Sequence, residues 1–227
     1  MTGDAWSIQS KVYGMAGLLG AALFTASLVV LHVARTEIDW RQDYVSYFVH
    51  GRLGWLFVLG AVVHGFGNLA LGQGLRRSLG HGRLRTWGVL FFGIAAAGIA
   101  LAGLLPIDPA ATPPTFVGRV HRGIVYVAFL GELVALFLFS AAFARHPDWQ
   151  RRSGTSFVLS AIATTALAGF LAALLLHRML GVAERWALAT FMVWEFWVAV
   201  HLIRSNPPPS RPAERPLLNG KHSRMPG

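Results

Sequence analysis

Cysteine is absent from the chain. This absence excludes disulfide bonds, thiolate nucleophiles, iron–sulfur clusters and cysteine zinc sites, so a bound metal would need His, Asp or Glu ligands. Charged residues are also scarce, at 13% of the chain, against roughly 25% in soluble domains. Because hydrophobic residues reach 54%, the polar surface is too small to cover a soluble fold, and we expect a membrane protein.

Lysine is nearly missing, so the net charge of +10 comes from arginine. A nucleic-acid interface would gather such charges on one solvated face. Here they stand in short groups between long apolar runs, as they do beside the cytoplasmic surface of a membrane. We therefore expect the lipid bilayer, and no nucleic acid, as the partner of these charges.

Six apolar segments are long enough to cross a bilayer core, which takes about 20 helical residues. Backbone groups in lipid must pair within their own segment, so the predicted fold class is an all-α bundle of six transmembrane helices. The first segment is longer than the roughly 7–15 apolar residues of a cleavable signal peptide. The predicted spans are 12–33, 54–75, 86–105, 124–144, 155–176 and 186–203.

The basic residues also predict an orientation. If the N-terminus lies in the cytoplasm, the segments on that side hold thirteen Lys and Arg, and the opposite loops hold seven. Cytoplasmic loops carry the excess of positive charge, so we expect both termini in the cytoplasm. Residues 205–227 hold six of the eleven prolines and predict a disordered tail after a membrane domain over 1–204.

Two short patterns predict local packing. In the third span, Gly93 and Ala97 form a small-xxx-small pair, which favours the close approach of a neighbouring helix. In the first outer loop, residues 36–52 place four aromatic side chains on one side of a helical wheel, and four polar ones within about 60° of each other. We expect an interfacial helix there. The aromatic residues are Trp40, Tyr44, Tyr47 and Phe48, and the polar ones are Asp39, Asp43, Ser46 and His50.

The predicted outer loops contain residues suited to catalysis or metal binding. Asp43, His50, Asp108 and His121 are carboxylates and imidazoles, the ligands that zinc or manganese accept. Ser46 could act as a nucleophile with His50 or His121 as its base. Neither an HxxxH nor an HExxH pattern accompanies them, so both the metal and the catalytic residues remain unassigned.

The same loops carry three arginines, Arg119, Arg122 and Arg185. Guanidinium groups bind phosphate in a bidentate geometry, so these residues are candidates for holding a lipid head group or another small anion. The alternative is a structural role for all of these polar residues, as loop caps and salt bridges in the head-group layer.

Four polar residues are predicted near the membrane midplane: His64, Asn68, Glu132 and Glu195. An ionisable group at this depth costs several kcal/mol unless it faces the bundle interior and is paired. The group could form a proton relay or a buried metal site, or His64 could be the axial ligand of a haem or pigment. The alternative is an interhelical hydrogen bond that fixes packing.

Three stretches of the chain together resemble one bacterial family. They are Tyr44-Val45-Ser46 with Gly54-Trp55-Leu56, then the run from Gly103 through Pro106-Ile107-Asp108-Pro109 to Gly118-Arg119-Val120-His121, and finally Gly181-Val182-Ala183-Glu184-Arg185 with Trp194. This pattern is similar to the domain of unknown function 998 family and covers about residues 10–204.

The resemblance implies six helices in the bacterial cytoplasmic membrane and a distant similarity to the Frag1/DRAM/Sfk1 membrane proteins. It supplies no established reaction, and the cofactor stays unknown. The positions that it marks are Ser46, Asp108, Arg119, His121 and Arg185, whereas the midplane residues lie outside its pattern.

Three functions are consistent with these observations. The first is the binding or modification of a lipid or isoprenoid-like molecule at the outer polar site. The second is a non-catalytic subunit of a larger respiratory or photosynthetic membrane complex, docked on a partner protein or on another copy of the chain. The third is a proton-coupled transporter that uses the midplane residues.

Overall fold

The computed structural model describes residues 3–110 and 112–204, with side chains from residue 8 onward. The tail predicted at 205–227 therefore lies outside the described residues. Within the described ranges the structure is all helical, with six α-helices and one short 3₁₀ helix. They are α1 (Gly3–Ala34), η1 (Val45–Val49), α2 (Gly54–Ser78), α3 (Arg83–Leu104), α4 (Phe116–Ala144), α5 (Gln150–Leu176) and α6 (Leu180–Arg204).

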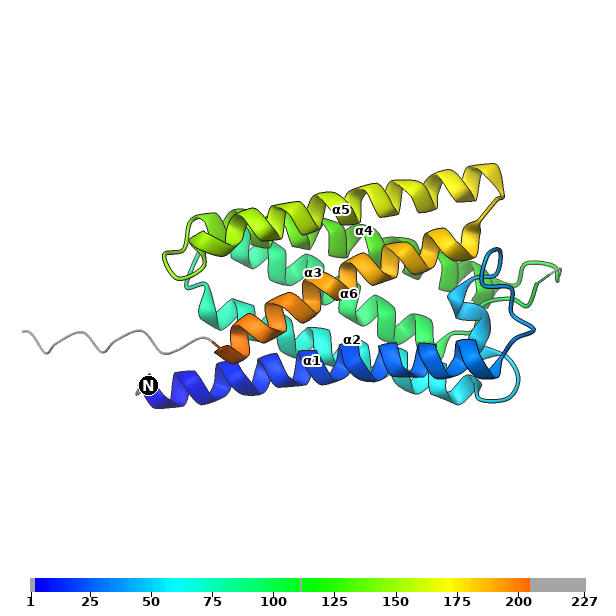
Figure 1. Ribbon diagram of the computed structural model, residues 1–227, viewed down its shortest axis with the longest axis horizontal. Helices are drawn as coiled ribbons and strands as arrows, with labels where there is room; N and C mark the ends of the chain where they lie inside the picture. Colours follow the sequence, from blue (N-terminus) through cyan, green and yellow to red (C-terminus); the bar gives the residue numbers. More distant parts are fainter. Residues whose placement is uncertain (1–2, 111, 205–227) are drawn as a thin grey trace, which may run out of the picture.

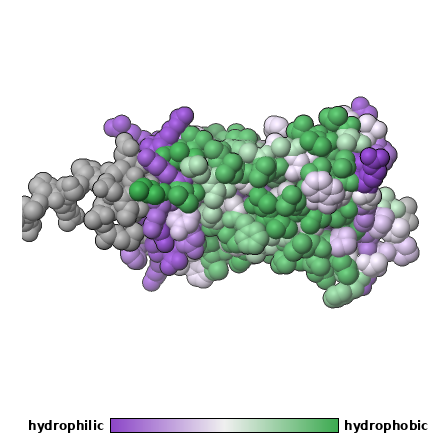
Figure 2. All heavy atoms as spheres, turned by 90° about the horizontal axis from the view of Figure 1, so that it is seen from below, coloured by the Kyte–Doolittle hydropathy of each residue, from purple (hydrophilic) through white to green (hydrophobic). Residues whose placement is uncertain are grey.

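All six predicted spans are confirmed as helices that are long and apolar enough to cross a membrane. A space-filling view has a broad apolar band around the middle of the molecule and hydrophilic side chains at both ends (Figure 2). The band is what lipid tails would contact, because apolar surface is stable in a bilayer core. The protein is thus a multi-pass membrane protein.

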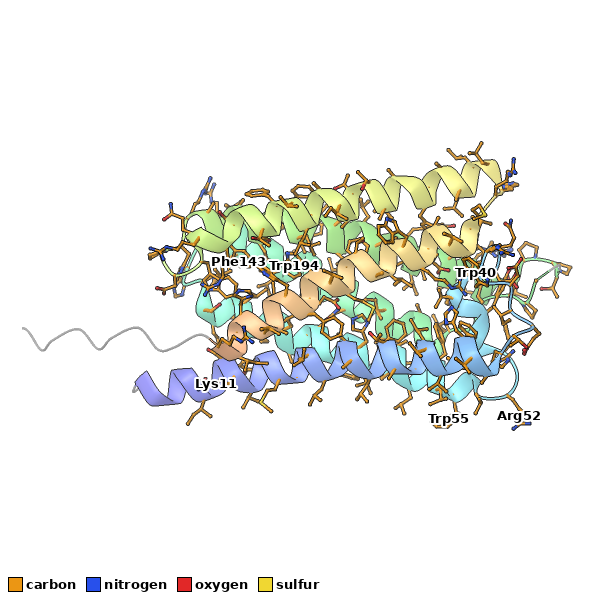
Figure 3. All side chains as sticks on the ribbon, in the orientation of Figure 1. Lys11, Trp40, Arg52, Trp55, Phe143 and Trp194 are labelled. Carbon is orange, nitrogen blue, oxygen red and sulfur yellow. The ribbon has the colours of Figure 1, made fainter. Side chains whose placement is uncertain are left out.

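The helices form a closed ring. Each α-helix packs against its neighbours in the chain, and α1 packs against α6 to complete the circle. The connections α1–α2, α3–α4 and α5–α6 lie together at one end of the bundle, which we call the η1 end because it carries η1 (Figure 1). Trp40 and Arg52 lie at this end and Lys11 at the other (Figure 3).

Small residues set the distance between helices. A Cβ atom added to Gly20 of α1 would lie 3.0 Å from the Cα of Gly67 in α2, so the two backbones touch as in other small-residue contacts between membrane helices. The pair predicted from Gly93 and Ala97 was wrong: nothing lies within 4 Å of an added Cβ at Gly93. Gly98 makes the contact instead, because an added Cβ would be 2.9 Å from the Ala128 Cβ on α4.

The interfacial helix expected over 36–52 takes a different form. After α1 the chain passes through turns, and only Val45–Val49 is helical, as the 3₁₀ helix η1. Phe48 is not directed toward lipid, since it is buried in a cluster with Phe24 and Phe57 of α1 and α2. The packing of η1 on the bundle therefore determines where Phe48 lies, and the helical periodicity of segment 36–52 does not.

The predicted orientation can be tested because the chain has no cysteine of its own. Arg52 at the η1 end and Arg83 at the opposite end are both exposed. With Arg52→Cys we expect labelling of intact cells by a membrane-impermeant maleimide, whereas Arg83→Cys should be labelled only after the membrane is opened. The reverse pattern would place the η1 end in the cytoplasm.

Candidate functional site

The loop between α3 and α4 is built around Asp108. Its carboxylate accepts a hydrogen bond of 2.5 Å from the Thr115 hydroxyl and one of 3.2 Å from the Thr115 amide. The Thr115 hydroxyl oxygen in turn accepts from the Gly118 amide at 3.1 Å and caps the start of α4. The hydrogen bond from Thr115, together with the nearby Arg122 guanidinium, holds the pKa of Asp108 below its usual value. The signature that carried the family resemblance thus forms a helix cap.

Two histidines hold the segment that precedes this cap. His121 Nδ1 donates to the Leu105 carbonyl at 2.6 Å, and His50 Nε2 donates to the Ile107 carbonyl at 2.7 Å. His121 is 1% exposed, and its Nε2 has no hydrogen-bond partner among the residues described. A buried polar atom without a partner costs free energy, so this nitrogen is a candidate contact for a bound molecule or water.

The start of α6 holds η1 in place. Glu184 is buried, and its carboxylate accepts a hydrogen bond of 2.6 Å from the Val45 amide. Arg185 donates to the Asp43 carbonyl at 2.8 Å, and its Nε donates to His32 Nε2 at 2.7 Å. The roles of Glu184 and His32 were missed in the sequence, because their partners Val45 and Arg185 lie far away in the chain.

The residues grouped in the sequence as a catalytic or metal site lie at the same end of the bundle but have separate hydrogen-bond partners there. Within residues 8–110 and 112–204 there is no group of three or more His, Asp or Glu side chains placed to hold a metal. Ser46 is buried beside Phe48 on η1, and among the described contacts its hydroxyl forms no hydrogen bond to His50 or His121. Asp43 caps its own turn by accepting from the Asp39 amide at 2.8 Å.

The three predicted anion-binding arginines also do different things. Arg119 is exposed and donates to the Pro114 carbonyl at 3.0 Å. Arg185 is committed to the η1 backbone, as described above. Arg122 is 3.7 Å from the Asp108 carboxylate and one third exposed, and it is the one of the three that lines the same small cavity as His121.

Two cavities meet beneath η1. The first, near the membrane surface, has a volume of about 10 Å³ and is lined by His121, Arg122 and Tyr126 among others. The second lies deeper, has a volume of about 50 Å³ and is mainly apolar. The two share Ser46, Val125 and Glu184 as walls. The deeper cavity is also lined by Phe24, Phe57, Ala61, His64, Gly98, Ile99, Ala102, Gly103, Ala128, Phe129 and Leu188.

The midplane residues do come together, in what we call the central cluster: His64, Asn68, Glu132 and Glu195. His64 Nε2 lies 2.7 Å from one Glu195 carboxylate oxygen, and the Asn68 amide donates to the other. Glu132 forms a side-chain hydrogen bond with Glu195. All four side chains are at most 2% exposed, so the cluster ties α2, α4 and α6 together in the bundle interior.

One face of the His64 ring packs against α1. Phe24 of α1 stacks on it with ring centres 5.0 Å apart. Since Nε2 is occupied by Glu195, Nδ1 is the only ring nitrogen left to bind anything else, and it has no partner among the described residues. The axial-ligand hypothesis would require the pair with Glu195 to break or the haem to enter from the Nδ1 side.

Comparison with protein-family models gives one match, Protein of unknown function (DUF998), over residues 18–201. The match covers most of the chain, so the chain belongs to this family. Comparisons with curated proteins and with solved structures give no match. The resemblance to the family is therefore confirmed, and the family supplies no reaction.

The cap at the start of α4 can be tested by a substitution at Gly118. A Cβ added at Gly118 would overlap the Asp108 carboxylate, whereas nothing lies within 4 Å of one added at Gly123 on the same helix. We expect Gly118→Ala to destabilise the protein by about 1–3 kcal/mol through overpacking, and Gly123→Ala to leave its stability unchanged. Thermal unfolding in mild detergent measures both. Equal stability of the two variants would contradict the cap.

Proposed function

We propose that this DUF998 member binds an amphipathic molecule, a lipid or isoprenoid-like compound, at the η1 end. The observation that carries the proposal is the pair of adjoining cavities, one beside polar groups near the membrane surface and one apolar below it. A ligand with a polar head and an apolar tail matches that sequence of environments. The deeper volume takes only a short part of a chain, so the rest would remain in the bilayer.

The polar head would meet Arg122 and His121. The Arg122 side chain is one third exposed and carries a permanent charge, which favours a phosphate or carboxylate. His121 Nε2 is a buried ring nitrogen without a partner in the described chain, and a head-group hydroxyl or phosphate would satisfy it. Tyr126 is 40% exposed beside them, with an apolar ring and a polar tip suited to the interface.

Binding is better supported than nucleophilic chemistry. A serine nucleophile needs a base within hydrogen-bond reach, and Ser46 has no such bond to either histidine among the described contacts. Asp108 is occupied with Thr115, so its replacement would disturb the loop as well as any site. His121 and Arg122 are the residues through which the proposal is best tested.

The test is native mass spectrometry of the protein purified in mild detergent. Wild type should carry a bound lipid, and His121→Gln or Arg122→Gln should weaken its binding by at least about tenfold, since a hydrogen bond to a charged group contributes about 1.5–3 kcal/mol. Arg119→Gln is the matched control, because Arg119 sits one turn away and contacts only its own loop. Its lipid content should equal that of wild type.

Two results would overturn the proposal. One is a folded wild-type protein that carries no lipid across extracts of different composition. The other is equal loss of lipid in Arg122→Gln and Arg119→Gln, which would reduce the effect to general surface charge.

A further inference from the structure

The two carboxyl groups of the central cluster cannot both be ionised. A hydrogen bond between Glu132 and Glu195 needs a proton, because two ionised carboxylates have no donor between them. Two negative charges in contact inside a low-dielectric bundle would also repel strongly. At least one exchangeable proton therefore resides there.

Polar atoms of the cluster are left without partners. His64 Nδ1, Asn68 Oδ1 and Glu132 Oε1 are all buried and have no hydrogen bond to the described residues. His64 lines the deeper cavity, whose volume of about 50 Å³ exceeds the roughly 10–15 Å³ that one water needs. A water in this cavity would satisfy the imidazole and connect it to the space beneath η1.

The deeper cavity lies between the central cluster and the η1 end. Glu184 and Glu195 are eleven residues apart on α6, which places them on the same face, about 16 Å apart along the axis. Glu184 lines the cavity at its η1 end, whereas His64, ten residues or about 15 Å into α2, lines it at the bundle centre. The cavity thus joins a buried carboxyl near the surface to the central cluster.

The opposite side of the cluster is closed by aromatic rings. Trp194, next to Glu195, packs with Phe92 and Phe139 at ring-centre distances of 5.9 Å, and Phe143 stacks on Phe139. All four side chains are at most 1% exposed, and Figure 3 places Trp194 and Phe143 within the bundle on the side away from η1. These rings therefore close the cluster toward the end of the bundle opposite η1. Asn68 also lines a groove between α2 and α3, on a flank of the bundle that lipid tails would cover.

No titratable side chain described on α1, α3 or α5 lies near the central cluster. The helices α1, α3 and α5 surround the cluster with apolar side chains such as Phe24, and their own titratable groups lie near the helix ends. Those groups are Lys11, Tyr13 and His32 on α1, Arg83 and Arg85 on α3, and Arg151 and Arg152 on α5.

We propose that the central cluster is a proton-binding site that exchanges its proton with the η1 side of the membrane through the deeper cavity, with Glu184 on the route. The proposal does not rest on the proposed lipid, because it needs no amphipathic ligand. An apolar tail bound in the deeper cavity would displace the water from the route. The ligand of the central cluster is the proton itself, held between Glu132, Glu195 and His64.

Infrared spectroscopy tests the bound proton. Folded wild type in lipid at pH 7 should show the stretching band of a protonated carboxyl group, and Glu132→Gln or Glu195→Gln should remove it. Glu37→Gln is the control, since Glu37 is exposed and paired with Arg35; Glu184→Gln separates any contribution from that residue. A wild-type spectrum without the band, or a band that survives both cluster variants, overturns the proposal. If a cluster variant fails to fold, a band that persists in Glu184→Gln supports the proposal, and the absence of a band from wild type still overturns it.

The route is tested by the rate at which this band shifts in deuterium oxide. Ala102→Leu fills the deeper cavity, so the shift should slow by at least about tenfold, because exchange must then wait for local opening of the bundle. Ala168→Leu, at an exposed position of α5 that lines neither the deeper cavity nor the groove beside Asn68, is the control and should exchange like wild type. Equal rates in the two variants would contradict access from the η1 side.

Discussion

The hydrogen bond between His64 and Glu195 is the interaction on which the interior of the bundle depends. It joins α2 to α6 across the ring, where neither side chain can reach water. In such surroundings an unpaired ionisable group costs several kcal/mol, so the helices are constrained to the one register that brings the two side chains together. Asn68 and Glu132 complete the pairing. The other interior contacts are small-residue and aromatic packing, together with hydrogen bonds that join Ser140, Ser156 and Trp194 of α4, α5 and α6.

At the η1 end, polar side chains mainly form hydrogen bonds to backbone groups. Asp108 serves the start of α4, His50 and His121 hold the preceding loop, and Glu184 with Arg185 holds η1. This end is therefore a rigid cover over the deeper cavity. The buried polar atoms that it leaves without a hydrogen-bond partner among the described residues include His121 Nε2 and Arg185 Nη2. His121 and Arg122 line one small cavity, and this supports the proposed binding site over a catalytic centre.

The six spans could be predicted from the sequence because a helix in lipid satisfies its own backbone, so length and hydropathy suffice. Depth in the membrane also grouped His64, Glu132 and Glu195 correctly. Partners were not predictable where they depend on which helices touch: Glu184 with the Val45 amide and Arg185 with His32 join residues more than 130 positions apart. The helical wheel over 36–52 was misleading, because burial of Phe48 against α1 and α2 determines that segment.

A double-mutant cycle on His64 and Glu195 tests the central interaction most directly. His64→Leu, Glu195→Leu and the double variant are unfolded reversibly in lipid–detergent mixtures, and the coupling free energy is taken from the four stabilities. We expect each single variant to be destabilised by about 3–5 kcal/mol, and the coupling to reach at least about 2 kcal/mol, above the roughly 1.7 kcal/mol maximum of single interhelical hydrogen bonds. Additive effects, with a coupling below the roughly 0.6 kcal/mol average of such bonds, would contradict the account.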